Sequence, residues 1–325
     1  MRGRADVALL RSLLSLVSPA GSGGRLSILV FHRVLAQPDP LFPGEVDAVM
    51  FNRICGWLSD WFEVLPLDQA VRRLRGGSLP ARALANTFDD GYADNHSVAL
   101  PILQRHGLSA TFYITTGFLD GGRMWNDTVI ESVRRCTRSQ LDLSDMQLDG
   151  LQPLPLDTLD QRRAAISAII DRIKYLPVAE RLQKVGVLAG LSGACLPDDL
   201  MMTSEQVRAM HQAGMQIGAH TVSHPILARL DPASARQEIE QSRQTLEGLT
   251  GDRVSQFAYP NGVPGRDFSE QTTAVVKALG FEGAVTTGWG AARSSTDCLQ
   301  LPRFSPWDRT ALRFAGRMAR NLWTS

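Results

Sequence analysis

Short apolar runs alternate with segments of helical character along most of this 325-residue chain, and this alternation limits the folds that it can adopt. The runs typical of strands are 27–31, 83–88, 110–115, 215–219, 255–258, 281–286 and 299–301. The segments typical of helices are 51–62, 67–75, 96–106, 204–213, 233–250 and 269–279. Because strands that alternate with helices form parallel sheets, the sequence predicts an α/β fold built on a parallel sheet or barrel.

The stretch from about 120 to 200 departs from this alternation because it has no strong strand signal. Three segments inside it have helical spacing, at 126–136, 156–175 and 178–191. We therefore predict a helical insertion, which could be a lid, a wall of a substrate groove or a packing appendage. The predicted parts of the chain are an N-terminal amphipathic helix and linker at 1–24, a barrel with this insertion at 25–305, and a basic helix at 306–325.

The charges of the chain nearly balance, since 34 basic and 33 acidic residues leave a formal net charge of +1. No overall field therefore draws the chain to nucleic acid or to anionic lipid. Near the N-terminus, Arg11 interrupts an apolar stretch that is too short to cross a bilayer. We expect a cytoplasmic protein, with an exported protein or a peripheral membrane contact as the alternatives. The C-terminal helix has an arginine at every fourth position, at Arg309, Arg313 and Arg317. Such a stripe is typical of a solvated helix face, and the alternative is a contact with anionic lipid or polymer phosphate.

Polar residues follow several of the predicted strands at the point where each strand ends. They are His32, Asp89, Asp90, His220, Tyr259 and Arg303. In a parallel barrel the carboxyl ends of the strands meet at one rim, where barrel enzymes assemble their active sites. The sequence therefore predicts that these residues converge.

Two of these strand ends carry residues suited to metal chemistry. Thr-Phe-Asp-Asp-Gly at 87–91 supplies a carboxylate pair, and His-Thr-Val-Ser-His at 220–224 supplies two imidazoles whose spacing predicts one helical turn. Such groups can hold a metal ion and the base beside it, which favours metal-assisted hydrolysis. An ordinary turn and a surface histidine pair are the simpler alternatives. The four cysteines contain no C-x-x-C pair, which argues against a thiolate zinc site.

Together with Phe-Ala-Tyr-Pro-Asn-Gly at 257–262, these motifs resemble the ordered motifs of the polysaccharide deacetylase family, also called NodB-homology or carbohydrate esterase family 4. The resemblance extends over about 27–303. An early Val-Phe-His-Arg-Val at 30–34 is similar to the branch that includes poly-N-acetylglucosamine deacetylases. The resemblance implies a distorted (β/α) barrel of about seven parallel strands with a helical insertion. It also implies a divalent metal, usually zinc.

The resemblance also implies a role for each motif residue. Asp90, His220 and His224 match the metal ligands, and three protein ligands leave positions open for water and substrate. Asp89 matches the general base. Breaking a C–N bond also needs a proton donor for the departing amine. The late Leu-x-His that supplies it in most relatives is absent, so His32 is the predicted acid, with a structural histidine as the alternative.

A second departure from the family concerns the group that orients the base. Relatives commonly have an arginine where this chain has Ala258, and Arg303 is the best substitute by position, with a surface ion pair as the alternative. Tyr259 and Pro260 are expected to shape the pocket, and the Tyr259 N–H is a candidate oxyanion donor by resemblance. Trp125 opens the insertion and could stack on a sugar or belong to the core.

Three functions of different classes remain open at this point. The first is a metal-dependent deacetylase that removes N-acetyl groups from amino sugars of an exopolysaccharide, a lipid-linked saccharide or another glycan. The second is an O-acetyl esterase or a non-sugar amide hydrolase on the same scaffold. The third is a catalytically silent barrel that binds glycans. The combination of a ligand set with an adjacent base favours an enzyme over a silent binding protein.

Overall fold

A sheet of seven parallel strands forms the centre of this computed structural model, which describes residues 4–148, 153–306 and 308–323. Six strands lie side by side in the order β1 (Ser27–Phe31), β3 (Ala83–Phe88), β4 (Thr111–Ile114), β7 (Gln216–Ala219), β8 (Gln256–Ala258) and β9 (Gly283–Val285). The seventh, β2 (Glu63–Val64), was not predicted and pairs with the start of β3. The six predicted strands are confirmed to within two residues at each end.

The segment after β9 closes the sheet without forming the strand predicted at 299–301. Leu301 forms a single parallel bridge to β9, and Phe304 forms another to β1. Between them, Pro302 has no N–H to donate, so a continuous ladder cannot form. The prediction of a strand here is therefore wrong. The fold class is confirmed, because these bridges join both edges of the sheet into a distorted (β/α) barrel and carry Arg303 to the rim.

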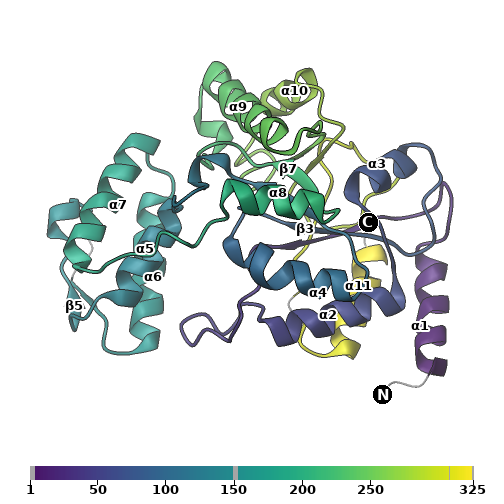
Figure 1. Cartoon of the computed structure of the whole chain (residues 1–325), viewed down its shortest axis with the longest axis horizontal. Coiled ribbons are helices and arrows are strands. Elements are labelled where there is room, and N and C mark those ends of the chain that lie inside the picture. Colours follow the sequence, from purple (N-terminus) through teal and green to yellow (C-terminus); the bar gives the residue numbers. More distant parts are fainter. Residues whose placement is uncertain (1–3, 149–152, 307, 324–325) are drawn as a thin grey trace.

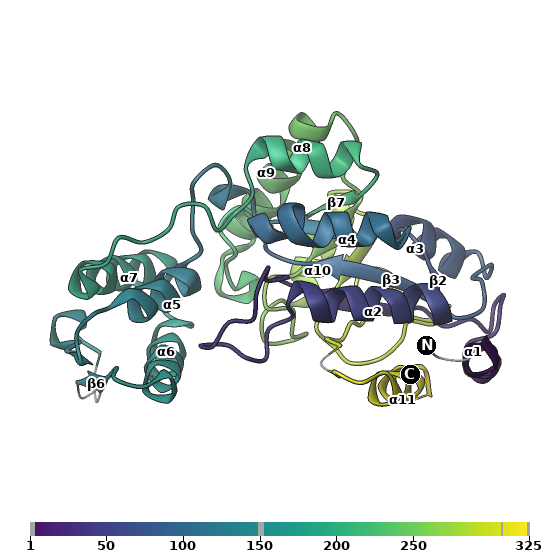
Figure 2. The ribbon, with the colours of Figure 1, turned by 60° about the horizontal axis from the view of Figure 1, so that its bottom comes forward.

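Helices surround the sheet, as Figures 1 and 2 show. They are α2 (Ala48–Trp61), α3 (Leu67–Arg75), α4 (Leu100–Arg105), α8 (Ser204–Gln212), α9 (Pro232–Thr250) and α10 (Glu270–Ala278). Local signals set their ends: the Thr203 side chain begins α8 with a capping box, and Gly251, at a φ of +76°, ends α9. The predicted helix 96–106 begins with a π-helical turn, Asn95–Ala99, that continues into α4.

A helical lobe lies beside the barrel in both views (Figures 1 and 2). We use this name for α5 (Trp125–Arg135), α6 (Leu159–Ile173) and α7 (Val178–Ser192), together with the short antiparallel pair β5 (Gln140–Leu141) and β6 (Leu154–Pro155). Its buried side chains form a hydrophobic cluster of their own, which includes Val129, Val133, Ile166, Ile169 and Leu188. The lobe therefore has an apolar core distinct from the clusters of the barrel.

Two terminal helices pack on the barrel, and the N-terminal one lies at the end of the molecule away from the lobe (Figure 1). Helix α1 (Arg4–Val17) packs against α2 and α11 (Ala311–Trp323), and its Leu14 is buried in the main core. The helix expected at 307–322 thus begins at Ala311, and Trp307 lies outside the described residues. Within the described parts of the chain, no helix combines the length and the apolar character needed to cross a membrane.

Candidate metal centre and active site

The turn after β3 brings two carboxylates to the rim of the barrel. Strand β3 is buried along its whole length, and Asp89 and Asp90 follow it directly. Asp90 has a φ of +74°, a left-handed conformation that aspartate tolerates better than most residues. Gly91 follows at a φ of +88°, and a Cβ at this position would lie only 3.2 Å from the Ile114 side chain. The turn therefore requires glycine at position 91.

The loop after β7 carries both histidines, but not on a helical turn. Thr221 and His224 have φ values of +68° and +53°, so the helical geometry predicted from their spacing is wrong. A positive φ is strained for a β-branched threonine, and such strain persists only where contacts hold it. Glu238 of α9 supplies these contacts, since it accepts hydrogen bonds from the backbone N–H groups of Val222 and Ser223 at 2.8 and 2.9 Å.

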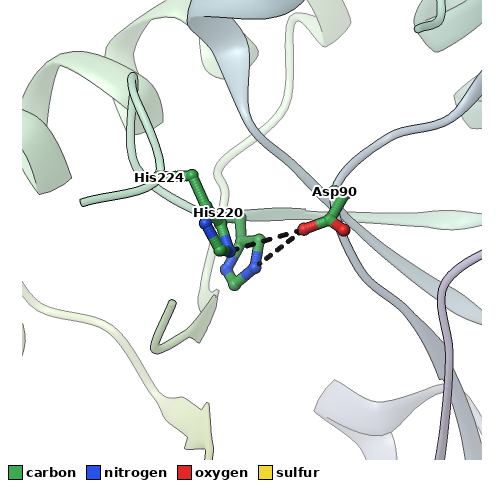
Figure 3. Close-up of side chains that lie close together, drawn as sticks. All are labelled: Asp90, His220 and His224. Atoms are coloured by element: carbon green, nitrogen blue, oxygen red, sulfur yellow. Dashed lines mark ion pairs between the residues drawn. The ribbon is translucent and has the colours of Figure 1, made fainter. Parts of the chain in front are cut away.

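Asp90, His220 and His224 point toward one another in Figure 3. The Nε2 atom of each histidine lies 3.5 Å from Asp90 Oδ1, and the three ligand atoms lie within 4.8 Å of one another. The other nitrogen of His220, Nδ1, lies 2.8 Å from the Ala258 carbonyl oxygen. Because a carbonyl oxygen can only accept, Nδ1 carries the proton and donates it in this hydrogen bond. The unprotonated Nε2 is then free to act as a metal ligand.

The chemistry of this donor set fits a divalent cation. Asp90 Oδ1 is buried and accepts no hydrogen bond, although an unpaired buried carboxylate oxygen is costly. One carboxylate with two imidazoles is a set that zinc and similar metals accept. A cation at this point would supply the missing partner of Asp90 Oδ1.

The three side chains also shift one another's pKa values. Burial would raise the pKa of Asp90, but its interactions with the neighbouring imidazoles of His220 and His224 hold it well below its ordinary value. Burial lowers the pKa of His224 to about 4, so this imidazole is neutral near neutral pH. Burial also acts to lower the pKa of His220, yet the nearby Asp90 and Asp89 carboxylates outweigh it and raise the pKa. Ionised carboxylate and neutral imidazole are the forms that bind metal.

Asp89 makes a two-pronged ion pair with Arg303, and both side chains are buried. Arg303 Nη1 and Nη2 each donate to one carboxylate oxygen at 2.7 Å. Its Nε donates to Thr286 O at 3.0 Å, and Nη1 also donates to Thr87 Oγ1 at 3.0 Å. Burial acts to raise the pKa of Asp89, but the Arg303 charge keeps it below the ordinary value. The structure thus places Arg303 in direct contact with Asp89, the carboxylate that it was predicted to orient.

A cavity of about 410 Å³ opens over these groups. Its barrel wall includes His32, Asp89, Asp90, His220 and His224, and its other wall comes from the lobe. The imidazole of His32 is exposed and near enough to help lower the pKa values of Asp89 and Asp90. Of the predicted strand-end residues, His32, Asp89, Asp90, His220 and Tyr259 therefore border one cavity. Arg303 does not line it and reaches it only through its contact with Asp89.

The remaining sequence-selected residues differ in their placement. Tyr259 borders the cavity, but its N–H donates to Val285 O at 3.3 Å and its hydroxyl to Leu299 O at 2.9 Å. That N–H, the expected oxyanion donor, thus already has a partner in the sheet, and its role toward substrate stays a prediction. Pro260 is buried and lies outside the cavity lining. Trp125 both borders the cavity and belongs to the core of the lobe.

Several residues at this site were missed by sequence reasoning. Tyr92 directly follows the 87–91 motif, and its hydroxyl donates to Asp127 of α5 at 3.1 Å. Burial raises the pKa of Asp127 to about 7, and the Asp90 charge adds to this effect. Adjacency to the motif was the signal for Tyr92. Asp127 and Glu238 carried no such signal, because each reaches the site from a helix distant in the sequence.

Comparisons with known proteins agree with this geometry. The chain matches the family model described as Polysaccharide deacetylase over residues 76–150 and 180–284, so His32 and Arg303 lie outside the match. YxkH of Bacillus subtilis strain 168, a proposed polysaccharide deacetylase, is 20% identical over 281 residues, 86% of this chain and 70% of that protein.

Two solved structures share the fold of this chain. IcaB from Ammonifex degensii has a TM-score of 0.58 at 17% identity, covering 94% of this chain and 98% of that one. A de-N-acetylase from Aggregatibacter actinomycetemcomitans has a TM-score of 0.58 at 18% identity, covering 90% of this chain and 99% of that one. Both are similar to the present chain along nearly all of their length.

Proposed function

Because the chain belongs to the polysaccharide deacetylase family and is a hydrolase of carbon–nitrogen bonds other than peptide bonds, we propose that it removes N-acetyl groups from amino sugars of a polysaccharide or glycan precursor in a metal-dependent reaction. The observation that carries this proposal is the buried set of Asp90, His220 and His224 beside the Asp89–Arg303 pair, all at one rim. The name of the de-N-acetylase with the same fold supports an N-acetyl rather than an O-acetyl substrate.

In this proposal Asp90, His220 and His224 hold a divalent metal, and two imidazoles with one carboxylate favour zinc. When bound, such a cation lowers the pKa of water and polarises the acetamide carbonyl. The buried Oδ1 of Asp90 supports this assignment, because no group in the described part of the chain donates a hydrogen bond to it. Glu238 acts indirectly, by fixing the loop from which both histidines project.

Asp89 is the proposed general base, which accepts the proton of the attacking water. Its low pKa keeps it ionised across the neutral range, so it is ready to take a proton. Arg303 is the proposed positioning residue, since two donors at 2.7 Å fix the carboxylate plane. Because Ala258 stands where relatives commonly carry an arginine, Arg303 supplies this contact at the same rim, from the segment that follows β9.

His32 is the proposed general acid. The departing amine is too basic to leave as an anion, so the nitrogen must receive a proton as the C–N bond breaks. His32 borders the same cavity as the ligand histidines, directly after β1, and its side chain is exposed. An exposed imidazole can exchange its proton with water between turnovers.

The test measures acetate release from N-acetylglucosamine oligomers and from O-acetylated xylan, before and after metal removal with a chelator. We expect release from the first substrate, loss of activity with the chelator, and recovery with Zn²⁺. Faster release from xylan would favour an O-acetyl esterase instead. Release that survives complete metal removal would contradict metal dependence, and absence of release from both substrates would contradict deacetylation of these glycans.

A further inference from the structure

An arginine of the lobe is buried at the cavity without a counter-charge. Arg181 of α7 is 3% exposed and borders the cavity. Its guanidinium lies over the Trp125 ring, 4.8 Å from the centroid, and Nη1 donates to Lys174 O at 3.1 Å. Its Nε is buried with no hydrogen-bond partner. Among residues 4–148, 153–306 and 308–323, no carboxylate pairs with it.

The other arginines of the cavity wall are compensated. Arg33 pairs with Asp94 at 2.7 Å, and Arg134 pairs with Asp39 at 2.7 Å and with Glu131 at 2.9 Å. A buried charge without a partner is costly, and buried charges in proteins are therefore almost always paired. Burial accordingly lowers the pKa of Arg181, with no opposing contribution from a carboxylate. This side chain departs from the pattern of its neighbours.

A second cation borders the same cavity. Lys174 stands at the C-terminal end of α6, and its ammonium group makes no ion pair within the described chain. Its backbone oxygen accepts a hydrogen bond from Arg181 Nη1, so the Arg181 guanidinium lies against the backbone of Lys174. Two unpaired cations at one wall of a cavity create a site of positive potential.

We propose that Arg181, with Lys174, binds an anionic group of the substrate, a phosphate or a carboxylate carried by the glycan near the sugar that is deacetylated. This inference rests on the proposed function and names the substrate class for the same cavity. Guanidinium groups hold such anions through paired N–H donors, and the Trp125 ring packs against the guanidinium of Arg181. The bound anion would supply the counter-charge that Arg181 lacks within the described part of the chain.

The connectivity of the wall orients such a substrate. Trp125, under Arg181, begins α5, and Asp127 two residues later reaches the Tyr92 hydroxyl beside the Asp90 turn. The lobe thus presents Arg181 on one side of the cavity while the acetamide meets Asp89 and Asp90 on the other. A neutral sugar would leave the Arg181 donors unpaired, whereas an acidic sugar or a sugar phosphate would satisfy them.

The test compares kcat/KM for acetate release from three matched substrates: a neutral N-acetylglucosamine oligomer, the same oligomer bearing a phosphate, and one bearing a neighbouring uronic acid. We expect the wild type to favour at least one acidic substrate, and the favoured arm identifies the anion. Arg181→Gln should reduce that preference at least about tenfold, as expected for loss of a charge-assisted hydrogen bond. Arg181→Lys should retain part of it.

Arg138→Gln is the matched control, because Arg138 is exposed after α5 and lies outside the cavity lining. It should leave the acidic-to-neutral ratio unchanged. A ratio near one in the wild type, or an unchanged ratio in Arg181→Gln accompanied only by a lower Tm, would overturn the proposal and make Arg181 a structural residue.

A binding measurement separates this proposal from the proposed function. Calorimetry with glucosamine 6-phosphate and with neutral glucosamine reports anion binding without turnover. Tighter binding of the phosphate that is lost in Arg181→Gln would support the anion site even if no acetate were released from any substrate. Equal binding of both ligands would contradict the anion site even in an active deacetylase.

Discussion

At the scale of single residues, the contact between Asp89 and Arg303 joins two segments that lie far apart in the sequence. Arg303 donates to Asp89 from the segment that closes the sheet. This segment forms a bridge to β9 at Leu301 and a bridge to β1 at Phe304, and these bridges bring Arg303 to the rim. Breaking a buried ion pair leaves a charge without compensation, which costs about 3–5 kcal/mol. Arg303 therefore stabilises the ionised form of Asp89 through its charge, and its two parallel N–H donors also fix the orientation of the carboxylate.

Arg303→Lys should lower kcat/KM roughly a hundredfold, because an ammonium cannot reproduce the two parallel donors that orient Asp89. With the compensation weakened, burial should dominate and raise the pKa of Asp89. Activity needs ionised Asp89, so the acidic limb of the kcat/KM profile should move to higher pH. The measurement is that profile together with metal content, which should stay at the wild-type level. An acidic limb at the wild-type pH would remove Arg303 as the group that positions the base.

Asp127 provides a pH-dependent test of stability. Its pKa is about 7 in the folded chain against an ordinary value of 3.8, so the folded state keeps a proton that the unfolded state releases. Stability should therefore fall as pH rises from about 4 to about 7, by on the order of a few kcal/mol. Asp127→Asn does not titrate and should lose this part of the decline.

The measurement is denaturant unfolding of the metal-free protein at pH 5 and pH 8, since a cation on Asp90 would oppose the charge that raises the Asp127 pKa. The difference in unfolding free energy between the two pH values should be larger in the wild type than in Asp127→Asn. Equal differences would show that Asp127 is ionised in the folded protein at both pH values.

At the scale of elements, the loop 220–224 is held between two neighbours. Glu238 of α9 binds it on one side, and Gly117, which follows β4, donates to Val222 O at 2.8 Å on another. A Cβ on Gly117 would lie 2.6 Å from that same oxygen, a distance that real structures do not tolerate. The positions of both histidines therefore depend on a glycine outside the motif.

Gly117→Ala should displace the loop and weaken metal affinity about 10- to 100-fold, the usual effect of disturbing groups that orient ligands. Gly186→Ala is the matched control, because a Cβ there would meet nothing within 4 Å in helix α7. Competition with a chromophoric chelator gives both affinities. Equal affinities in the two variants would show that the loop does not need its contact with Gly117.

The sequence pattern predicted the elements well where a local rule decides them. Alternating runs located the strands, and the helices predicted at 204–213 and 233–250 agree with α8 and α9 to within one residue at each end. The pattern failed where a tertiary contact decides. A His-x-x-x-His spacing fits a helix, but Glu238 and the strained Thr221 impose an irregular loop. Pro302 interrupts the last strand because its missing N–H outweighs the apolar character of its neighbours.

At the scale of the whole molecule, the cavity belongs to the barrel and the lobe together. The strand-end rule placed the carboxylates and imidazoles on one rim, and this part of the site could be read from order and spacing alone. The opposite wall could not, because it depends on how the lobe docks. Arg181, Trp125 and Asp127 come from different parts of two helices, and no local pattern marks them as neighbours.

The central claim is a division of labour, in which Asp90 holds the metal and Asp89 moves the proton. Metal content by mass spectrometry, measured with acetate release on the same purified samples, tests it most directly. Asp90→Asn should lose both metal and activity, whereas Asp89→Asn should keep about one metal per chain and lose about two to four orders of magnitude in kcat. Full metal content in Asp90→Asn, or near-normal turnover in Asp89→Asn, would contradict the account.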